Sequence, residues 1–326
     1  MRAQELRRLA GPDGLELVEI PDPPENGRDV VIDVRAAGVS FPELLYTYGK
    51  YQDRREPPFV PGVEVAGVVH WAPPEVPVTV GDRVAACTFF GGFAERATAS
   101  PDFTFRLADE LSFEQGAALV LNYQTAHFCL SHRGRVASGE TVLVHGAAGG
   151  VGTAALQVLA GLDAQPIAVV SSVTKRDFVL AHMPDVPVVL LRTGWTDEVR
   201  DLTDGRGVDA VFDPVGGDRF TVSLRVLAQE GRVIVVGFAD GQIPSVKVNR
   251  LLLRNVGVVG AAWGPFVQAD PRVARGIGDA LADMGRRGLV APVVGSRFQL
   301  AEAADALREV ERRTSLGKVV LQVPPR

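Results

Sequence analysis

The sequence predicts an α/β protein that combines a doubly wound parallel sheet with a second, β-rich part. Two observations support this fold class. From about residue 119, short apolar strands alternate with helical stretches, a pattern typical of βαβ units and a parallel sheet. Before that residue, short Val-rich runs are separated by Pro and Gly clusters, which indicates a small barrel-like or sheet domain.

The β-rich part covers residues 1–118. Its apolar runs are short, and turn-forming residues separate them. The runs are Val30–Val34, Val63–Val69 and Arg83–Cys87, and the clusters between them are PDPPENG (21–27), PPFVPG (57–62) and PPEVP (73–77).

The alternating part begins with an apolar strand and a glycine-rich turn. The expected strands are Thr141–His145, Ile167–Ser171, Val186–Leu191, Val208–Asp213, Arg232–Val236 and Val256–Ala262. The expected helices are Thr153–Leu162, Lys175–His182, Trp195–Leu202, Asp218–Leu227 and Pro271–Arg287. The remaining residues return to strand, helix and strand, at Val293–Phe298, Ala301–Arg313 and Lys318–Val323. We therefore expect a nucleotide-binding domain, residues 119–288, inserted into a first domain made of residues 1–118 and 289–326.

Composition excludes several classes of protein. The 326 residues contain 34 basic and 39 acidic side chains, so the net charge of −5 argues against a nucleic-acid partner. Two cysteines exclude a disulfide framework and favour a reducing, cytoplasmic location. No secretory leader and no run of about 18 apolar residues is visible, so we expect no membrane association.

The turn GAAGGVG (146–152) follows a strand and opens a helix, which is the context of a dinucleotide-binding fingerprint. Glycines let the backbone approach a pyrophosphate, and the free N–H groups of the helix start attract it. Gly149, Gly150, Val151 and Gly152 are the expected contacts. The fingerprint departs from G-x-G-x-x-G at its first glycine, which is Ala147 here. A turn used only for helix–strand packing is the alternative.

The end of the second strand of this part predicts which cofactor binds. A carboxylate there would bond the ribose hydroxyls of NAD. The chain instead has Ser171, Ser172, Lys175 and Arg176, and the first acid is Asp177 inside the helix. Hydroxyls and cations suit a 2′-phosphate, so we predict NADPH. The alternative is that Lys175 and Arg176 are solvated residues of the first helical turn.

Several segments of the chain together resemble one known family. They are HGAAGGVG (145–152), PPFVPGVEVAGVV (57–69), GDRVAA (81–86), FDPVGG (212–217), GRVIVVGF (231–238), GVSFPELL (38–45), GKYQ (49–52) and LNYQTAHF (121–128). This set resembles the medium-chain dehydrogenase/reductase superfamily, and more narrowly its zinc-free, NADPH-dependent quinone oxidoreductase branch. The resemblance runs from about Val31 to Leu321.

The resemblance implies a GroES-like catalytic domain around a Rossmann domain, with the active site between them. It also implies a homodimer joined through the edge strand, here Val256–Ala262. Zinc-dependent relatives carry a cysteine and a histidine where this chain has Ser40 and Val63, and a four-cysteine loop that is absent here. No two histidines are spaced i,i+4 to start a metal site, so we expect no zinc.

Without a metal, a conjugated acceptor is the more plausible substrate, because its negative charge spreads over an enolate or hydroquinone-like anion. A few hydrogen bonds can then stabilise that charge. The resemblance implies Tyr51, Tyr46 and Ser40 as the donors near the acceptor, and it places Asn122 and Thr125 at the domain crossover that faces nicotinamide. Each tyrosine has the alternative of being a half-buried packing residue.

Four further cofactor contacts are expected mainly from the resemblance. Val215 would lie near the nicotinamide ribose, and the backbone around Phe238 would meet the nicotinamide amide. Arg192 would replace a tyrosine that often meets the adenosine phosphate. Lys318 would contact the cofactor side, or it is a strand-edge charge that discourages aggregation.

These observations predict an NADPH-dependent reductase of quinones or α,β-unsaturated carbonyls. The alternatives are an enoyl-thioester reductase and a non-catalytic NADPH-binding protein with a structural or regulatory role. RNA binding, attributed to some relatives of this branch, is disfavoured because no basic stripe is present.

Overall fold

The computed structural model describes residues 1–325. The chain divides into two compact units. Unit 1 comprises Met1–Asn122, Pro271–Gly278 and Pro292–Arg326, and unit 2 comprises Tyr123–Asp270 and Asp279–Ala291. The predicted assignment of GroES-like and nucleotide-binding domains to these stretches stays a prediction.

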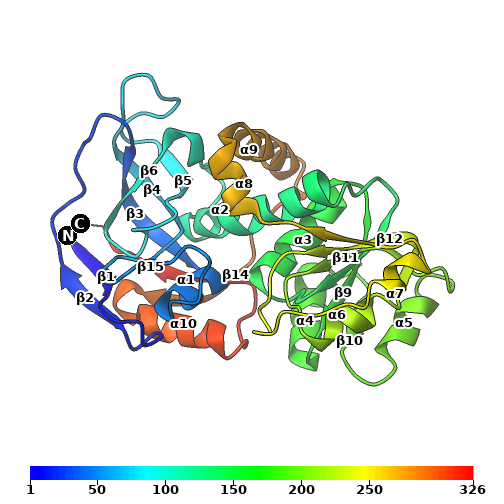
Figure 1. The fold of residues 1–326 in the computed structure, drawn as a ribbon. Helices are drawn as coiled ribbons and strands as arrows, with labels where there is room; N and C mark the ends of the chain where they lie inside the picture. The colour runs from blue at the N-terminus through cyan, green and yellow to red at the C-terminus, as the bar shows by residue number, and fades with distance from the viewer. Residues whose placement is uncertain (326) are drawn as a thin grey trace. The chain divides into compact units, whose positions relative to one another are not determined.

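Unit 1 is built on a largely antiparallel sheet (Figure 1). Its strand order is β14-β15-β3-β4-β5-β7, and β6 also pairs with β3. The strands are β3 (Val30–Val39), β4 (Glu64–Trp71), β5 (Arg83–Cys87), β6 (Arg96–Ala99), β7 (Thr104–Arg106), β14 (Val294–Gln299) and β15 (Lys318–Gln322), and a separate hairpin joins β1 (Arg2–Leu6) to β2 (Leu15–Glu19). The helices are α1 (Phe41–Thr47), α10 (Ala303–Glu311) and the 3₁₀ turns η1 (Pro101–Phe103) and η3 (Leu300–Glu302), while α2 (Phe113–His127) contributes residues to both units.

Unit 2 contains a six-stranded parallel sheet in the order β10-β9-β8-β11-β12-β13. The strands are β8 (Thr141–His145), β9 (Gln165–Val170), β10 (Val188–Leu190), β11 (Val208–Asp213), β12 (Leu227–Val235) and β13 (Gly257–Gly260). The helices are α3 (Gly150–Gly161), α4 (Val173–His182), α5 (Trp195–Asp201), α6 (Asp218–Ser223), α7 (Asn249–Leu252), α8 (Trp263–Ala269) and the π-helical turn η2 (Phe128–Arg133), while α9 (Pro271–Arg286) contributes residues to both units. This is the doubly wound order, in which the order of the strands reverses between β8 and β11.

The predicted α/β fold class is confirmed, and the differences lie at the ends of elements and in helices that the prediction missed. α3 begins three residues before the expected start because the helix begins within the glycine turn itself. The helix expected at 218–227 ends at Ser223. α2 crosses the point where the sequence pattern changes, and neither neighbouring pattern indicates it.

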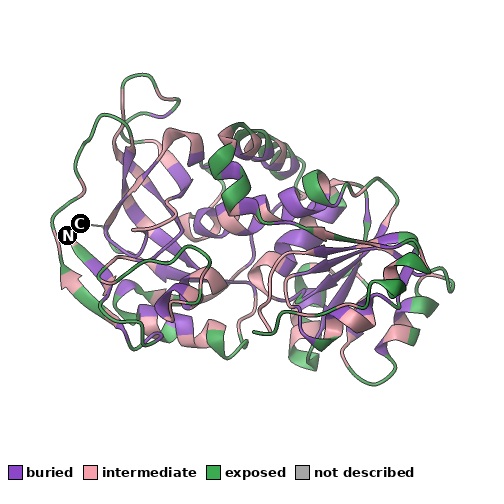
Figure 2. Ribbon diagram, viewed as in Figure 1, coloured by how far each residue is buried: buried purple, intermediate pink, exposed green. Residues whose placement is uncertain are grey.

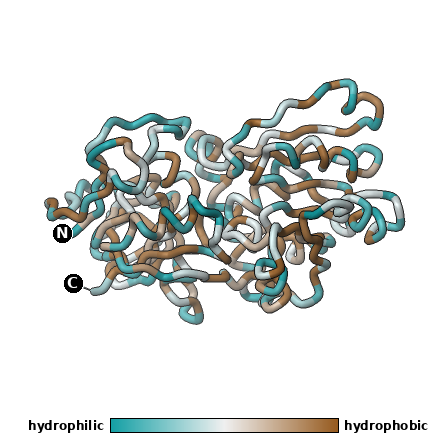
Figure 3. Tube along the Cα trace, turned by 90° about the horizontal axis from the view of Figure 1, so that it is seen from below, coloured by the Kyte–Doolittle hydropathy of each residue, from teal (hydrophilic) through white to brown (hydrophobic). Residues whose placement is uncertain are grey.

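Burial follows the sheets in both units. Figure 2 shows the strands of both sheets mainly as buried and many of the peripheral loops as exposed. β8 is buried over all five of its residues, as expected of a central parallel strand covered on both faces. Figure 3 shows that hydrophobic segments also reach the periphery of the chain. Within residues 1–325, no helix has the length and hydrophobicity that crossing a bilayer requires.

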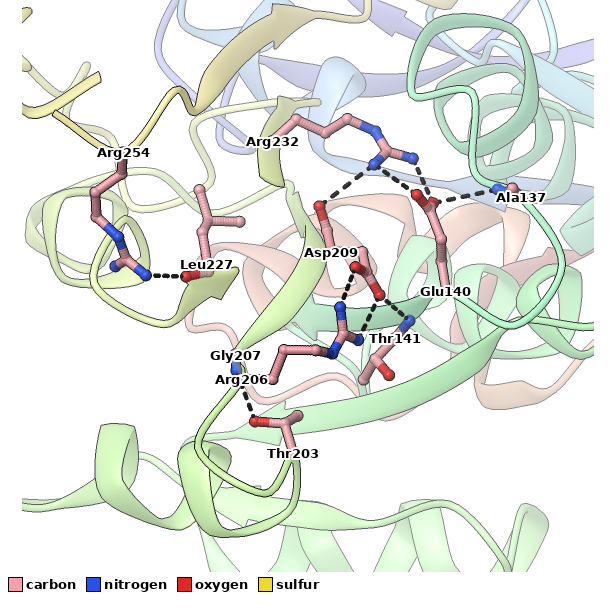
Figure 4. Close-up of polar contacts among 10 residues, drawn as sticks. All are labelled: Ala137, Glu140, Thr141, Thr203, Arg206, Gly207, Asp209, Leu227, Arg232 and Arg254. Atoms are coloured by element: carbon pink, nitrogen blue, oxygen red, sulfur yellow. Dashed lines mark hydrogen bonds and ion pairs between the residues drawn. The ribbon is translucent and has the colours of Figure 1, made fainter. Parts of the chain in front are cut away.

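A network of charged side chains joins the starts of β8 and β11 to Arg232 of β12 in unit 2 (Figure 4). Arg232 Nη1 donates to Glu140 Oε1 at 3.0 Å and to the Asp209 carbonyl at 3.3 Å. Asp209 Oδ2 accepts from the Thr141 N–H at 2.8 Å and from Arg206 Nη2 at 2.8 Å. The Arg232 side chain is 17% exposed and the Arg206 side chain 53% exposed, so water screens the second pair far more than the first.

We predict that Arg232→Met lowers the free energy of unfolding by about 3 kcal/mol, because it leaves the Glu140 carboxylate without its cationic partner in a partly buried site. Urea denaturation measures the change. Arg206→Met is the matched control and should cost at most about 1 kcal/mol. Equal losses in the two variants would contradict the role assigned to Arg232.

Candidate functional site

The glycine turn after β8 forms an open helix start. Gly146 has φ +62°, a conformation that favours glycine, and α3 begins after Gly149 with no side chain capping it. A Cβ on Gly152 would lie 2.1 Å from the Gly146 carbonyl oxygen, so Gly152 permits the close approach of helix and turn. A Cβ on Gly149 would meet only that same oxygen, at 3.4 Å. Gly149, Gly150 and Val151 are partly exposed. The free N–H groups of this helix start can therefore receive an anionic group.

The turns after β9 and β10 carry the residues predicted for the 2′-phosphate. Ser172 is the N-cap of α4, and its Oγ accepts from the Lys175 N–H at 3.3 Å. Ser171 is exposed and Lys175 is partly exposed at this helix start. Arg192 is exposed after β10, with Nη2 3.6 Å from Glu198 Oε2. Because β9 and β10 are neighbouring parallel strands, these residues follow the same edge of the sheet.

The turn after β11 is held by the buried carboxylate of Asp213. Its Oδ1 accepts from the Val215 and Gly216 N–H groups, both at 2.9 Å. The Asp240 N–H donates to the Val215 carbonyl at 2.8 Å, and a Cβ on Gly216 would lie 3.0 Å from the ring of Phe238. The structure thus brings Val215 and Phe238 together. A Cβ on Gly146 would lie 3.3 Å from the Val215 side chain, so this turn also faces the turn after β8, where the strand order reverses.

His145 is the last residue of β8 and is fully buried. Its Nε2 lies 2.7 Å from Ser223 Oγ. Because the Ser223 hydroxyl itself donates to the Arg219 carbonyl at 2.8 Å, Nε2 carries the proton and donates to Ser223. Burial lowers the pKa of His145, an effect that the nearby Asp213 opposes. The neutral imidazole therefore connects the end of β8 to α6.

Asn122 and Thr125 lie three residues apart on α2, where residues at this spacing share a face. Asn122 is buried and Thr125 is partly exposed.

In unit 1, the predicted tyrosines belong to an aromatic cluster formed by Tyr46, Tyr51, Phe59 and Phe90. The ring centroids of Tyr46 and Tyr51 are 4.4 Å apart, and those of Tyr46 and Phe90 are 4.8 Å apart. Burial raises the pKa of both tyrosines, and the Tyr51 pKa is raised further by the charge of Glu43. Both phenols therefore remain protonated at neutral pH and can donate hydrogen bonds.

The second predicted group in unit 1 lies at the end of β3. β15 pairs with one edge of β3 so that Val319 lies opposite Val39. One step further along this antiparallel ladder, Lys318 adjoins Ser40, which caps α1. The topology excludes the strand-edge alternative for Lys318, because β15 lies between β14 and β3 and Lys318 is 1% exposed.

β4 pairs with the other edge of β3, so that Val65 lies opposite Ala37 and Glu64 adjoins Gly38. A Cβ on Gly38 would lie 2.6 Å from Glu64 Oε1. Because Gly38 has no side chain, space remains beside β3 in which Lys318 of β15 can reach Glu64 of β4.

Lys318 uses this space. Its Nζ donates to Ser40 Oγ and to Glu64 Oε1. The other oxygen of the fully buried Glu64 accepts from the Leu121 N–H at 2.7 Å. We call Ser40, Glu43, Glu64 and Lys318 the Lys318 cluster.

Glu43 completes the Lys318 cluster from α1. Its Oε1 accepts from the Val63 N–H at 2.9 Å and its Oε2 from the Ser40 N–H at 3.1 Å. Burial raises the pKa of Glu43 to about 7, against the opposing effect of the Lys318 ammonium. Within residues 1–325, no group of three or more His, Cys, Asp or Glu side chains could hold a metal ion.

The predicted list did not include Glu43, Glu64 or Asp213. A signal existed for Glu43, because Ser40-x-x-Glu43 is the pattern of a capping box. Asp213 is a single acid at the end of an apolar strand, and that pattern indicates neither its partners nor its role.

Comparison with known proteins identifies the family. The description "Alcohol dehydrogenase GroES-like domain" matches residues 26–109, and "Zinc-binding dehydrogenase" matches residues 150–275. A bovine (Bos taurus) "Quinone oxidoreductase-like protein 2" is 37% identical over 95% of this chain and 89% of the relative. The chain belongs to the quinone oxidoreductase branch of the medium-chain dehydrogenase/reductase superfamily.

Two solved structures are similar to this chain along its whole length. The quinone oxidoreductase of Thermus thermophilus, whose structures include a complex with NADPH, has a TM-score of 0.83 and 33% identity over 99% of this chain and 100% of that one. The CurK enoyl reductase has a TM-score of 0.89 and 26% identity over 99% of each chain. The predicted family is therefore confirmed, and this member of it is an oxidoreductase.

The buried His145 predicts a pH dependence of stability. The pKa of His145 is lower in the folded protein than in the unfolded chain. When the pH falls below about 6.5, this histidine therefore becomes protonated in the unfolded chain first, which favours unfolding. The stabilisation is complete above that pH and is lost below it, by at most about 1.4 kcal/mol per pH unit.

We expect His145→Gln, whose amide can still donate to Ser223, to flatten the decline in the free energy of unfolding between about pH 6.5 and 5. Urea titrations at a series of pH values measure it. His182→Gln, at an exposed histidine, is the control and should leave the profile unchanged. Identical profiles for wild type and His145→Gln would contradict the prediction.

Proposed function

We propose that this protein is an NADPH-dependent oxidoreductase that reduces quinones or α,β-unsaturated carbonyl compounds without a metal ion. The observation that carries the proposal is the uncapped start of α3 at the strand-order reversal between β8 and β11. Ligands of doubly wound folds bind at this reversal, at the carboxyl ends of the strands.

The residues present fit NADPH. The N–H groups at Gly150 and Val151 would meet the pyrophosphate, and Ser171, Ser172 and Lys175 would meet the 2′-phosphate, with Arg192 as a further cation. The remaining contacts proposed for the cofactor are Gly149, Gly152, Val215, Phe238, Asn122 and Thr125. When bound, NADPH supplies a hydride from nicotinamide.

Unit 1 supplies the groups proposed for the acceptor. The partly exposed rings of Tyr51, Phe59 and Phe90 offer aromatic and apolar contacts for a conjugated molecule. Tyr51 and Ser40 offer hydrogen-bond donors for the oxygen on which charge develops. Each such donor contributes roughly 2.7–4 kcal/mol to transition-state stabilisation in well-organised sites. Ser40 and Val63 occupy the positions at which zinc-dependent relatives carry ligands, which supports chemistry without zinc.

A turnover assay tests the proposal and its alternatives. NADPH oxidation is followed with a naphthoquinone, a small enone and crotonyl thioester. We expect turnover with the naphthoquinone or the enone. Turnover with the thioester alone would instead identify an enoyl reductase, as in the CurK relative. Saturable NADPH binding without turnover on any acceptor would indicate a non-catalytic binding protein.

We also propose that two copies pair through β13, the edge strand of the parallel sheet. The described chain exposes large apolar side chains close to this strand in sequence, including Leu252, Leu253 and Val258. Exposed apolar residues of this kind are typical of surfaces that another protein covers. A cytoplasmic location is proposed as well, in keeping with Cys87 and Cys129 as buried free thiols.

Lys175→Ala should weaken NADPH binding about 10-fold or more while leaving NADH binding nearly unchanged, because the lost ammonium would pair with the 2′-phosphate, which NADH lacks. Titration calorimetry with both cofactors measures this difference. Arg286→Ala removes an exposed positive charge elsewhere in unit 2 and serves as control. Equal losses for NADPH and NADH would contradict the assignment.

Tyr51→Phe should lower kcat by about 10- to 100-fold with little change in NADPH affinity, because it removes a donor to the reacting oxygen. Steady-state kinetics with the best acceptor of the panel measures kcat and KM. The control is Tyr48→Phe, which removes a nearby hydroxyl that bonds Glu311 at 2.6 Å. Unchanged turnover in Tyr51→Phe would remove Tyr51 as a donor.

A further inference from the structure

We propose that Lys318 is a positioning residue that makes the Ser40 hydroxyl a one-directional hydrogen-bond donor to the acceptor oxygen that becomes negatively charged. This inference rests on the proposed function and assigns to Lys318 a role other than contact with the cofactor. The buried contacts from Lys318 to Ser40 and Glu64 carry it.

The direction of the Lys318–Ser40 hydrogen bond follows from chemistry. An ammonium group has three donors and no acceptor, so the Ser40 oxygen must accept from Lys318. The hydroxyl proton of Ser40 then points away from Lys318. Ser40 is partly exposed, unlike Lys318 and Glu64, so this proton can reach a bound molecule. The hydroxyl can still rotate, but only the orientation away from the ammonium satisfies both groups.

The ammonium also strengthens Ser40 as a donor. Hydrogen bonds in series polarise one another, and the effect is larger where water is excluded. At 1% exposure, Lys318 acts with little screening. The Glu43 carboxylate accepts from the Ser40 N–H at 3.1 Å and so fixes the backbone that carries the hydroxyl.

Glu64 determines that Ser40 stabilises charge and does not transfer its own proton. If Ser40 gave up its proton, Lys318 would have to replace it and become neutral. The fully buried Glu64 carboxylate would then lose its only cationic partner on the described chain, and an unpaired buried charge is strongly destabilising. Lys318 therefore stays charged throughout the reaction.

The electron movement in the reaction is then defined. The hydride that NADPH would supply, with NADP⁺ as the oxidised product, adds to the β-carbon of the enone. The π pair of the C=C bond then forms the new C=C bond of an enolate, and the carbonyl π pair moves to oxygen. That oxygen accepts the hydrogen bond from Ser40. A proton from a tyrosine hydroxyl or from water completes the reduction at carbon.

A double-mutant cycle tests the coupling of Lys318 to Ser40. One arm is Ser40→Ala. The other is Lys318→Met with Glu64→Gln, which removes both charges so that neither is left buried alone. Each arm should lower kcat by about 10- to 100-fold with NADPH affinity retained, and the combined variant should show no further loss. Ser40→Thr should restore most of the activity.

The control removes another ion pair of unit 1, which joins the half-exposed Arg2 to the buried Glu95. Arg2→Met with Glu95→Gln eliminates a pair at 2.7 Å and should leave kcat unchanged. Additive losses in the cycle would overturn the proposal, since a purely structural contribution of Lys318 would add to that of Ser40. Absence of turnover in the wild type would instead contradict the proposed function.

A second measurement needs neither turnover nor a change at Lys318. With NADP⁺ present, 4-nitrophenol serves as a coloured mimic of the oxyanion. Its ionisation should shift to lower pH by about one unit on binding, and Ser40→Ala should remove most of that shift. The chain has four lysines, so the Lys318 ammonium resonance can be assigned in ¹⁵N-lysine NMR spectra.

The Lys318 resonance should move when the phenolate binds to the wild type and should remain in place in Ser40→Ala. An equal ionisation shift in both proteins, a Lys318 resonance that does not respond, or failure of the wild type to bind the phenolate would each overturn the proposal.

Discussion

A lysine ammonium buried in unit 1 constrains much of what surrounds it. A buried charge must be paired, and the pairing of Lys318 with Glu64 joins side chains from strands on opposite edges of β3. The pair requires the missing side chain of Gly38, a long β3 between the two partners, and the amide of Leu121 for the second carboxylate oxygen. Ser40 stands at the open end of this arrangement, so the same contacts that satisfy the charge also orient a hydroxyl toward the surroundings.

In unit 2, the important groups are the backbone N–H groups in the turns that follow the parallel strands. Its parallel strands end in turns whose N–H groups must be satisfied, and the protein leaves those at the start of α3 without a side-chain cap. The turn after β11 is instead held by Asp213, which uses one carboxylate oxygen for two N–H groups. A rigid turn beside an open helix start is the combination that receives an anionic cofactor without competition from the chain's own side chains.

The sequence predicted the repetitive part of the fold and the family closely. Thr141–His145 and Val208–Asp213 have the expected bounds because each has an apolar centre, VLV in the first and AVF in the second, and lies next to turn-forming residues. The surroundings of Lys318 could not be predicted, since Ser40 lies 278 residues away and only sheet register brings the two together. A lysine near the start of a strand has the same local pattern whether its strand is central or peripheral. Tertiary pairing, which no short motif encodes, decides between the two.

The amino and carboxyl ends of the parallel strands in unit 2 have different roles. Arg232, Glu140 and Asp209 fasten the amino ends, whereas the opposite ends carry glycine turns and short polar loops. The stability of the sheet and its choice of ligand thus depend on residues at opposite ends of the strands. During evolution, the loops at the carboxyl ends of the strands can therefore change while the charged network at the other end maintains the fold.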